Sequence, residues 1–302
     1  MTLVAPTSIG GGPAGEAGIS DVAEARPLRK EVWGRFKRNR LALVGLGFLI
    51  LLVLVAIFAP WIAPYSARER PVSLSSPPSR DHWFGTDQIG RDVLSRVIHG
   101  SRISLKIGFT ATAMSLVIGV LLGAIAGYFG GILDTLISRL TDILLAIPYI
   151  VLAVAVASIY GRSENTVILV LGLTGWLSIT RIVRSSFLSL KQLEYVEAAR
   201  ALGYKGRRIM FRHILPNAVQ PVIVYGTISV GGVILAEAAL SFLGVGPQDP
   251  SPAWGLMVSL AKGRIANAPH ELFFPGAAII ATVLAFVFIG DGLRDALDPK
   301  LR

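Results

Sequence analysis

Few residues in this sequence combine the type and the spacing that chemistry requires. The chain has no cysteine, which excludes a thiolate metal site, a disulfide and a cysteine nucleophile. Its four histidines are scattered, so the spacing of a metal site is missing. The sequence contains no Gly-Lys-Ser or Gly-Lys-Thr and therefore no phosphate-binding loop of the Walker A kind. We predict no catalytic residue, no metal ligand and no cofactor bound by this chain.

A few charged residues lie in or beside long apolar runs, where burying a charge is costly. Arg139 and Asp142 are three residues apart, a spacing that places them on one face of a helix. We predict a structural ion pair there rather than a solute contact. Glu237 follows Ala218 by 19 residues, about 28 Å along a helix. We expect it at the outer boundary of a membrane, held by packing or by a hydrogen bond to the loop 246–271.

The composition shows what kind of protein must position these residues. Of the 302 residues, 53% are hydrophobic and 16% are charged, whereas a soluble domain carries about 25% charged residues. The net charge of +10 would suit nucleic acid only if it formed a soluble patch, but the basic residues lie between apolar runs. We therefore predict an integral membrane protein that contacts the lipid bilayer and no nucleic acid.

Six apolar runs are long enough to cross a membrane as helices, which takes about 20 residues each. We predict an all-α membrane protein with six transmembrane helices, the third kinked at Pro148. The fourth run is short and should continue past Arg181, whose long side chain can reach the interface. Gly119, Gly123 and Gly127 recur every four residues, as in closely packed helices. The runs are 41–63, 107–133, 143–161, 165–180, 214–236 and 272–290.

The basic residues predict the orientation, because Lys and Arg collect on the cytoplasmic side. Segments 26–40 and 184–216 hold seven each, so both termini are predicted to be cytoplasmic. Residues 1–25 are glycine-rich and contain no basic residue, which predicts a disordered cytoplasmic tail. Residues 26–101 would form the first span and an outer loop with an amphipathic helix capped by Thr86 and stopped at Gly100. Residues 102–292 would form the main transmembrane domain and 293–302 a cytoplasmic tail.

The connector between the fourth and fifth spans is longer than a turn between two helices requires. Leu193, Val196 and Ala199 recur at helical spacing, and Gly203 is typical of a helix C-terminus. Ala198 and Ala199 are small, so we expect another surface to approach this helix closely. Pro216 would begin the next span. A short amphipathic helix presented to the cytoplasm suits mechanical coupling to a docked partner.

The same connector resembles the E-A-A loop in the permease subunits of bacterial ABC importers. The shared residues are Glu197-Ala198-Ala199, Gly203 and Ile214-Leu215-Pro216, with His213 standing where the usual pattern has isoleucine. Four other segments are similar to the dipeptide, oligopeptide and nickel branch of that family, so the resemblance covers about residues 29–302. These segments are Trp33–Tyr65, Phe84–Leu105, Glu237–Trp254 and Gly290–Arg302.

The resemblance implies a type I ABC importer permease in the bacterial inner membrane. Such a subunit pairs with a second homologous permease, two ATP-binding subunits and an extracytoplasmic peptide-binding protein. ATP and magnesium would be used by the ATPase partner. The resemblance also implies an ATPase-coupling helix built from Glu197, Ala198, Ala199 and Gly203 together with Leu215 and Pro216. The expected solutes are dipeptides or oligopeptides; nickel or another small solute is the alternative within the family.

Two functions from other classes remain open on the sequence. A secondary transporter driven by an ion gradient would need buried carboxylates near the middle of broken helices, and the charge-free runs contain none. A membrane-anchored scaffold protein would leave the long cytoplasmic connector unexplained.

Overall fold

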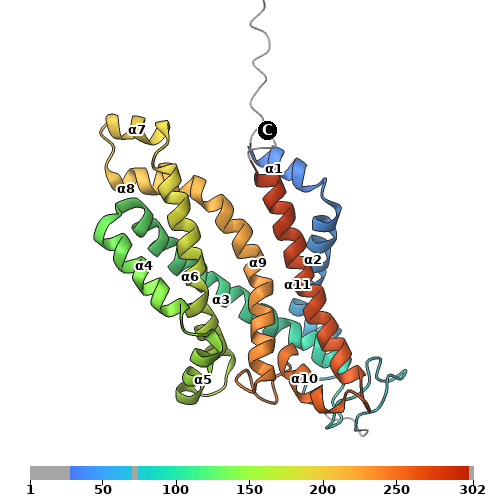
Figure 1. Cartoon of the computed structure of the whole chain (residues 1–302). Helices are drawn as coiled ribbons and strands as arrows, with labels where there is room; N and C mark the ends of the chain where they lie inside the picture. The colour runs from blue at the N-terminus through green and yellow to red at the C-terminus, as the bar shows by residue number, and fades with distance from the viewer. Residues whose placement is uncertain (1–27, 70–73, 299–302) are drawn as a thin grey trace, which may run out of the picture.

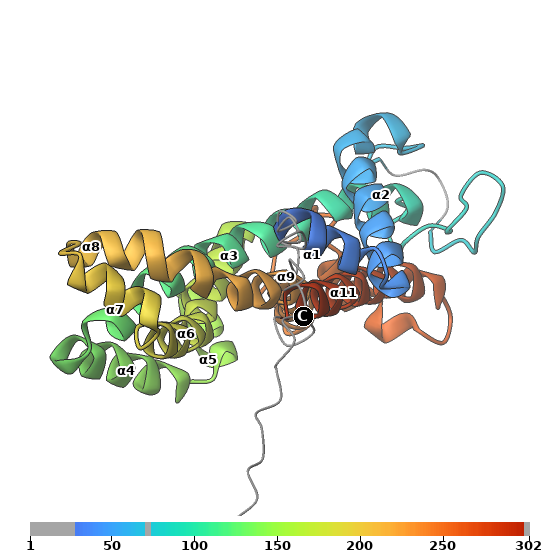
Figure 2. The ribbon, with the colours of Figure 1, turned by 90° about the horizontal axis from the view of Figure 1, so that it is seen from above.

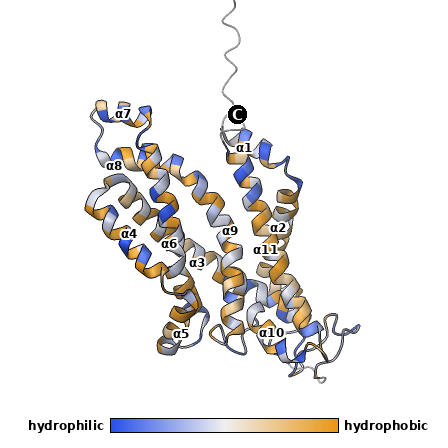
Figure 3. Cartoon of the chain, viewed as in Figure 1, coloured by the Kyte–Doolittle hydropathy of each residue, from blue (hydrophilic) through white to orange (hydrophobic). Residues whose placement is uncertain are grey.

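The computed structural model describes residues 28–69 and 74–298. Across these two ranges the regular structure is helical, apart from one isolated bridge between Thr86 and Asp92. Five helices are long and apolar enough to cross a membrane, and a bent helix pair would make a sixth crossing. Figure 3 shows apolar residues along these helices and hydrophilic residues mostly towards the two ends of the bundle, with others along α4 and α6. The tail expected at 1–25 and the last four residues of the one expected at 293–302 lie outside the described residues.

The helices follow one another with short connections, except in the outer loop before α3. Figure 1 shows them as a bundle in which α9 stands between α6 and α11. The view from above in Figure 2 agrees: α4 to α8 lie on one side of α9, and α1, α2 and α11 on the other. The bounds are α1 Leu28–Phe36, α2 Arg40–Ile62, α3 Val93–Phe129, α4 Gly131–Leu145, α5 Tyr149–Tyr160, α6 Glu164–Leu190, α7 Glu194–Ala201, α8 Gly206–Arg208, the π-helical turn η1 Ile209–Ile214, α9 Leu215–Phe242, α10 Trp254–Ala261, η2 Lys262–Arg264 and α11 His270–Leu297.

The short helices α7 and α10 mark opposite ends of the bundle, here named the α7 end and the α10 end (Figure 1). The long helix α3 runs from the α10 end to the α7 end and packs along α6 in the most extensive helix contact of the described chain. The expectation that the fourth span continues past Arg181 is confirmed, because α6 reaches Leu190.

The glycine row confirms the predicted close packing of helices. A Cβ atom on Gly119 would lie 2.6 Å from the Cβ of Ile179 in α6, nearer than real Cβ atoms approach one another. The same conflict repeats one and two turns further on, for Gly123 against Val183 and Gly127 against Phe187. Only glycine therefore allows the backbone of α3 to lie this close to α6.

The prediction of a separate amphipathic helix, capped by Thr86 and stopped at Gly100, is wrong. The helix begins at Val93, where the Asp92 carboxylate accepts a hydrogen bond from the Ser95 amide at 2.7 Å and so caps the N-terminus. It does not stop at Gly100 but continues unbroken to Phe129. Gly100 is needed for close packing, because a Cβ there would lie 2.4 Å from the carbonyl oxygen of Pro252.

The third span is not a kinked helix but two helices, α4 and α5, bent by 83° at residues 146–148. Pro148 lacks the amide that would continue α4, and a proline disfavours helical geometry in the residue before it. The chain therefore leaves the helix after Leu145 and starts a new one at Tyr149. The expectation of a simple kink at Pro148 is corrected to a full break.

Candidate functional site

The connector between α6 and α9 folds as predicted into a short helix, α7, set apart from the spans at one end of the bundle (Figure 1). It covers Glu194–Ala201 and is followed by a loop, the single turn α8 and the π-helical turn η1, which runs directly into α9. The connector that contains α7 thus joins two helices that both run through the bundle, α6 and α9.

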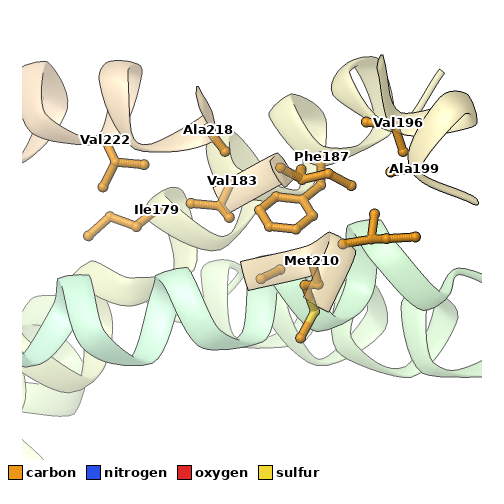
Figure 4. Packing of buried hydrophobic residues seen from close by; sticks show 11 residues of the cluster. Ile179, Val183, Phe187, Val196, Ala199, Met210, Ala218 and Val222 are labelled. Atoms are coloured by element: carbon orange, nitrogen blue, oxygen red, sulfur yellow. The ribbon is translucent and has the colours of Figure 1, made fainter. Parts of the chain in front are cut away.

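The inward face of α7 consists of Val196 and Ala199, which are fully buried or nearly so. They join a hydrophobic cluster with Phe187 of α6 and with Ile209 and Ile214 of η1, part of which Figure 4 shows from close by. Ala199 thus packs against the chain's own core. The expectation that both alanines admit another surface is corrected: only Ala198 faces outwards.

The outward face of α7 is a small surface of carboxylates and apolar groups, beside the exposed guanidinium of Arg200. Glu194, Glu197, Ala198 and Ala201 are exposed, and Leu202 beyond the helix end is 73% exposed. Within the described chain, Glu197 makes no ion pair and no side-chain hydrogen bond. We call these five residues the α7 outer face. A carboxylate beside an exposed leucine suits a partner groove that is apolar and carries a basic rim.

Gly203 ends α7 as predicted, in the left-handed conformation with φ of +76°. The Tyr204 amide donates to the Ala199 carbonyl at 3.2 Å and the Gly203 amide donates to the Arg200 carbonyl at 2.9 Å. These two bonds are the pair that defines a Schellman motif, which closes a helix C-terminus. The motif fixes the direction in which the chain leaves α7.

Leu215 and Pro216 are not part of the coupling helix but the first two residues of α9. Leu215 packs against the same hydrophobic cluster that holds α7. Polar contacts reinforce this link: the Tyr195 hydroxyl lies 3.5 Å from the His213 carbonyl and 3.4 Å from the Asn217 amide nitrogen. The structure therefore brings all six predicted site residues to one end of the bundle, in two connected elements.

The predicted ion pair between Arg139 and Asp142 is wrong. Asp142 pairs instead with Arg181 of α6, whose Nη2 lies 2.6 Å from its Oδ1. A neighbouring pair, Asp134 with Arg184, also joins α4 to α6. Arg181 lies on the neighbouring helix, and its guanidinium reaches the Asp142 carboxylate directly. Arg139, on the same helix as Asp142, makes no ion pair within the described ranges.

Two family models match the chain. Residues 119–302 match the model described as "binding-protein-dependent transport system inner membrane component". Residues 27–78 match the "N-terminal TM domain of oligopeptide transport permease C". The first match covers more than half of the chain. The chain belongs to this family of inner membrane components.

Curated relatives of this inner membrane component cover nearly its whole length. It is 46% identical over 274 residues to the dipeptide transport system permease protein DppC of Alkalihalophilus pseudofirmus, covering 90% of both chains. It is 43% identical over 276 residues to the oligopeptide transport system permease protein OppC of Bacillus subtilis, covering 91% of this chain and 90% of that protein. The glutathione transport system permease protein GsiD of Escherichia coli O157:H7 is 46% identical over 274 residues, covering 90% of both.

The fold is shared with a chain of the MetNI methionine ABC transporter solved in inward-facing conformations. The TM-score is 0.57 at 22% identity, and the match covers 68% of this chain and 98% of that chain. At this identity the likeness concerns the fold of the inner membrane component and not its solute.

The buried acid Glu237 is placed partly as predicted. It lies in α9 near the α10 end, 1% exposed, and packs against Gly255 in α10, within the loop 246–271. Its hydrogen bond comes from Ser241, one turn further along α9, at 2.7 Å rather than from the loop. Among the described residues of the inner membrane component, no three His, Asp or Glu side chains are grouped to hold a metal.

Sequence reasoning missed a buried ionic network at the α10 end. Arg91 is 2% exposed and donates to Asp87 at 2.7 Å and to Asp249 at 2.6 Å. Arg96, 1% exposed, donates to the carbonyls of Ala67 and Ser251, each at 3.2 Å. The network ties the outer loop of the inner membrane component to the segment before α10. Only the spacing of Asp87 and Arg91 hinted at it, since the other partners are distant in sequence.

Proposed function

We propose that this chain is the membrane-spanning permease subunit of an ATP-driven importer for dipeptides or oligopeptides. It forms half of the solute pathway and is driven through α7 by a separate ATPase. The chain itself binds no nucleotide, and ATP with magnesium is used by the partner subunits.

The observation that carries the coupling proposal is the division of α7 into two faces. Val196 and Ala199 fix the helix to α6 and η1, while Glu197 and Ala198 point away from the chain. A helix packed in this way transmits force from a docked partner to the spans and does not merely connect them. The ATPase is the partner whose motion the importer needs, because the sequence contains no Walker A loop of its own.

The proposed solute class rests on the relatives. The names of three relatives at 43–46% identity refer to dipeptide, oligopeptide and glutathione transport, and each alignment covers at least 90% of this chain. Glutathione is itself a small peptide, so the three names share one chemistry. The match of residues 27–78 to the N-terminal domain of an oligopeptide permease supports the same class.

The proposed assembly follows from the family. A second homologous permease supplies the other half of the pathway, two ATP-binding subunits dock at the α7 end, and an extracytoplasmic peptide-binding protein delivers the solute at the α10 end. The α7 end is proposed to be cytoplasmic, because the basic segments 26–40 and 184–216 belong to it. Both termini would then lie in the cytoplasm.

The test is peptide uptake by the complete importer carrying Glu197→Lys. Uptake of alanine di-, tri- and tetrapeptides into vesicles is measured together with the amount of ATPase that co-purifies with the permease. Because Glu197 is exposed and unpaired within the described chain, the reversal should leave folding intact but reduce uptake and ATPase association about tenfold, about 1.4 kcal/mol of docking.

Asp295→Lys is the control, since Asp295 is also exposed and at the α7 end but lies on α11, away from α7, where its carboxylate accepts only a long, exposed hydrogen bond of 3.4 Å from Asn39. It should leave uptake unchanged. If the Glu197→Lys permease is present in the membrane at the normal amount and the importer takes up peptide at the wild-type rate, the coupling role is contradicted. Failure of the wild-type importer to accumulate any of the peptides would contradict the proposed solute class.

A further inference from the structure

A pocket of about 600 Å³ opens between α3, α6, α9 and the break that separates α4 from α5. That volume is in the range of sites for small ligands, about 300–1,000 Å³. None of its lining residues carries a charge, but hydroxyl groups enter it from several helices. The hydroxyl-bearing lining residues are Thr112, Ser115, Tyr149, Thr174, Tyr225 and Ser229.

These hydroxyls lie in the middle of the spans. Thr112 is 19 residues from the start of α3 and 17 from its end, and Ser229 is 14 and 13 residues from the ends of α9. At about 1.5 Å per residue, both hydroxyls are about 20 Å or more from either helix end. The pocket is therefore at the depth of the hydrocarbon core.

Thr112 is the hydroxyl that most needs a partner. It is 3% exposed, and its Oγ1 makes no hydrogen bond within the described chain. Ser115 donates to the Gly172 carbonyl at 2.9 Å and Ser229 to the Tyr225 carbonyl at 2.7 Å, but each oxygen can still accept. Leaving a buried hydroxyl unpaired costs about 1–3 kcal/mol, and a polar ligand would recover it only where neighbouring side chains move aside, because the oxygen itself is covered.

The helix break beside the pocket requires water or protein around it. Ile147 and Pro148 line the pocket in non-helical conformation, and Ile147 is 43% exposed. At membrane depth, irregular backbone is tolerated only where it lines a water-filled cavity or is covered by protein, because lipid offers no hydrogen bonds. Lipid chains are therefore unsuited to this face.

An ion pair borders the pocket on the side of the α7 end. Leu177 and Leu145 line the pocket; Arg181 follows the first by four residues and Asp142 precedes the second by three. The side chains of Arg181 and Asp142 are 55% and 50% exposed. A half-exposed ion pair in a transmembrane segment faces water or a polar cavity rather than lipid.

From these observations we infer that the pocket is the part of the solute path that this chain lines, and that it binds the uncharged backbone of a short peptide. The half-buried hydroxyls of Thr174 and Ser229 offer hydrogen bonds to peptide amides, and the aromatic rings of Tyr149 and Tyr225 offer apolar contact. The Arg181–Asp142 pair lies on the route from the pocket to the α7 end. This inference rests on the proposed function as a peptide importer.

Gly232→Trp tests the inference in the complete importer. Gly232 lines the pocket, and a Cβ added there meets no atom within 4 Å, so the indole fills the pocket without displacing the chain. Gly47→Trp is the matched control, because Gly47 also has open space around it but lies on α2, away from the pocket. We expect Gly232→Trp to lower alanine-peptide uptake about tenfold, or about 1.4 kcal/mol, and Gly47→Trp to leave it unchanged.

If the unmodified importer moves peptide and the Gly232→Trp importer moves it at the same rate, the pocket assignment is overturned but the proposed function is not. An unmodified importer that moves no alanine peptide would instead contradict the proposed function. The level of each variant in the membrane is measured to separate a blocked path from a misfolded chain.

Cysteine labelling provides a second readout that does not depend on transport. The natural chain has no cysteine and so serves as the blank. Gly232→Cys should react with a charged, water-soluble methanethiosulfonate reagent about ten times faster than Gly47→Cys, because a thiolate forms in water and not in lipid. Trialanine added to the cycling importer should slow the reaction at Gly232→Cys.

Equal, slow labelling of the two variants would overturn the inference by showing a pocket that lipid covers. Fast labelling at Gly232→Cys that trialanine leaves unchanged would overturn it by showing a wet surface that binds no peptide.

Discussion

Val196→Ala should loosen α7 without weakening the bundle. Val196 is fully buried in the cluster that joins α7 to α6 and η1, and the other buried side chain of α7 is already an alanine, Ala199. The substitution removes two methyl groups, each worth about 0.8 kcal/mol of buried apolar surface. The loss of about 1.6 kcal/mol falls on the attachment of α7, so the detached state should become about 15 times more populated.

Hydrogen–deuterium exchange of residues 194–202 in the complete importer measures this population. The amides of α7 should exchange about 15 times faster in Val196→Ala than in the natural chain. The number of peptides moved per ATP hydrolysed should fall, because a detached helix moves without moving α6 and α9. Val44→Ala is the control, since Val44 is 66% exposed on α2 and the same methyl groups contribute little there.

Two results would refute this reasoning. If α7 exchange in Val196→Ala matches that in Val44→Ala, the cluster does not hold α7. If exchange rises but the ratio of peptide to ATP stays constant, the attachment exists but does not carry the force.

Three further predictions concern the seams of the molecule. Gly203→Ala should cost about 1–2 kcal/mol locally, because φ is +76° there, and should raise proteolysis between α7 and α8 in the folded importer. Gly119→Val should cost about 1–3 kcal/mol through overpacking against α6 and lower the thermal stability of the purified permease, whereas Gly47→Val should not. Equal stability of the two variants would contradict the close packing of α3 on α6. A double-mutant cycle with Arg181→Ala and Asp142→Ala should give an interaction below about 1 kcal/mol if water reaches the pair, and a value of several kcal/mol would show that it is dry.

The spans could be predicted from sequence because a membrane imposes a simple rule on composition. Every apolar run of the required length is largely helical, although the runs 107–133 and 143–161 each contain a break between two helices, and α6 continues past Arg181 as expected. The close packing at Gly119, Gly123 and Gly127 could also be predicted, because residues four apart lie on one face of a helix whatever the rest of the fold does.

Most of the errors concern contacts between distant segments. Asp142 lies within one turn of Arg139 but pairs with Arg181, 39 residues away, and local spacing carries no information about that neighbour. Gly100 was expected to stop a helix, but the carbonyl of Pro252 is packed against it. Pro148 predicted a disturbance in the helix, while the angle of 83° depends on how α5 packs against α6.

The short helix in the connector between α6 and α9 was predicted correctly, but its two faces were not told apart. Ala198 and Ala199 are identical in type and adjacent in sequence, and one is exposed while the other is buried. The difference arises from the cluster around Phe187 and Ile209, whose arrangement depends on the return of the chain through η1. The pocket escaped prediction for a similar reason, since Thr112, Thr174 and Ser229 belong to three separate runs.

The glycine seam between α3 and α6 has a mechanical consequence. Where backbone lies directly against the next helix, no flexible side chain remains to take up a displacement, so α3 and α6 should travel as one rigid lever when α7 is pulled. Bending must then be concentrated elsewhere, and two proline-containing segments are suited to it: the break at Pro148 and the part of α9 around Pro221, a proline inside that helix. A protein built in this way would move as rigid groups of helices about two hinges rather than bend evenly along its length.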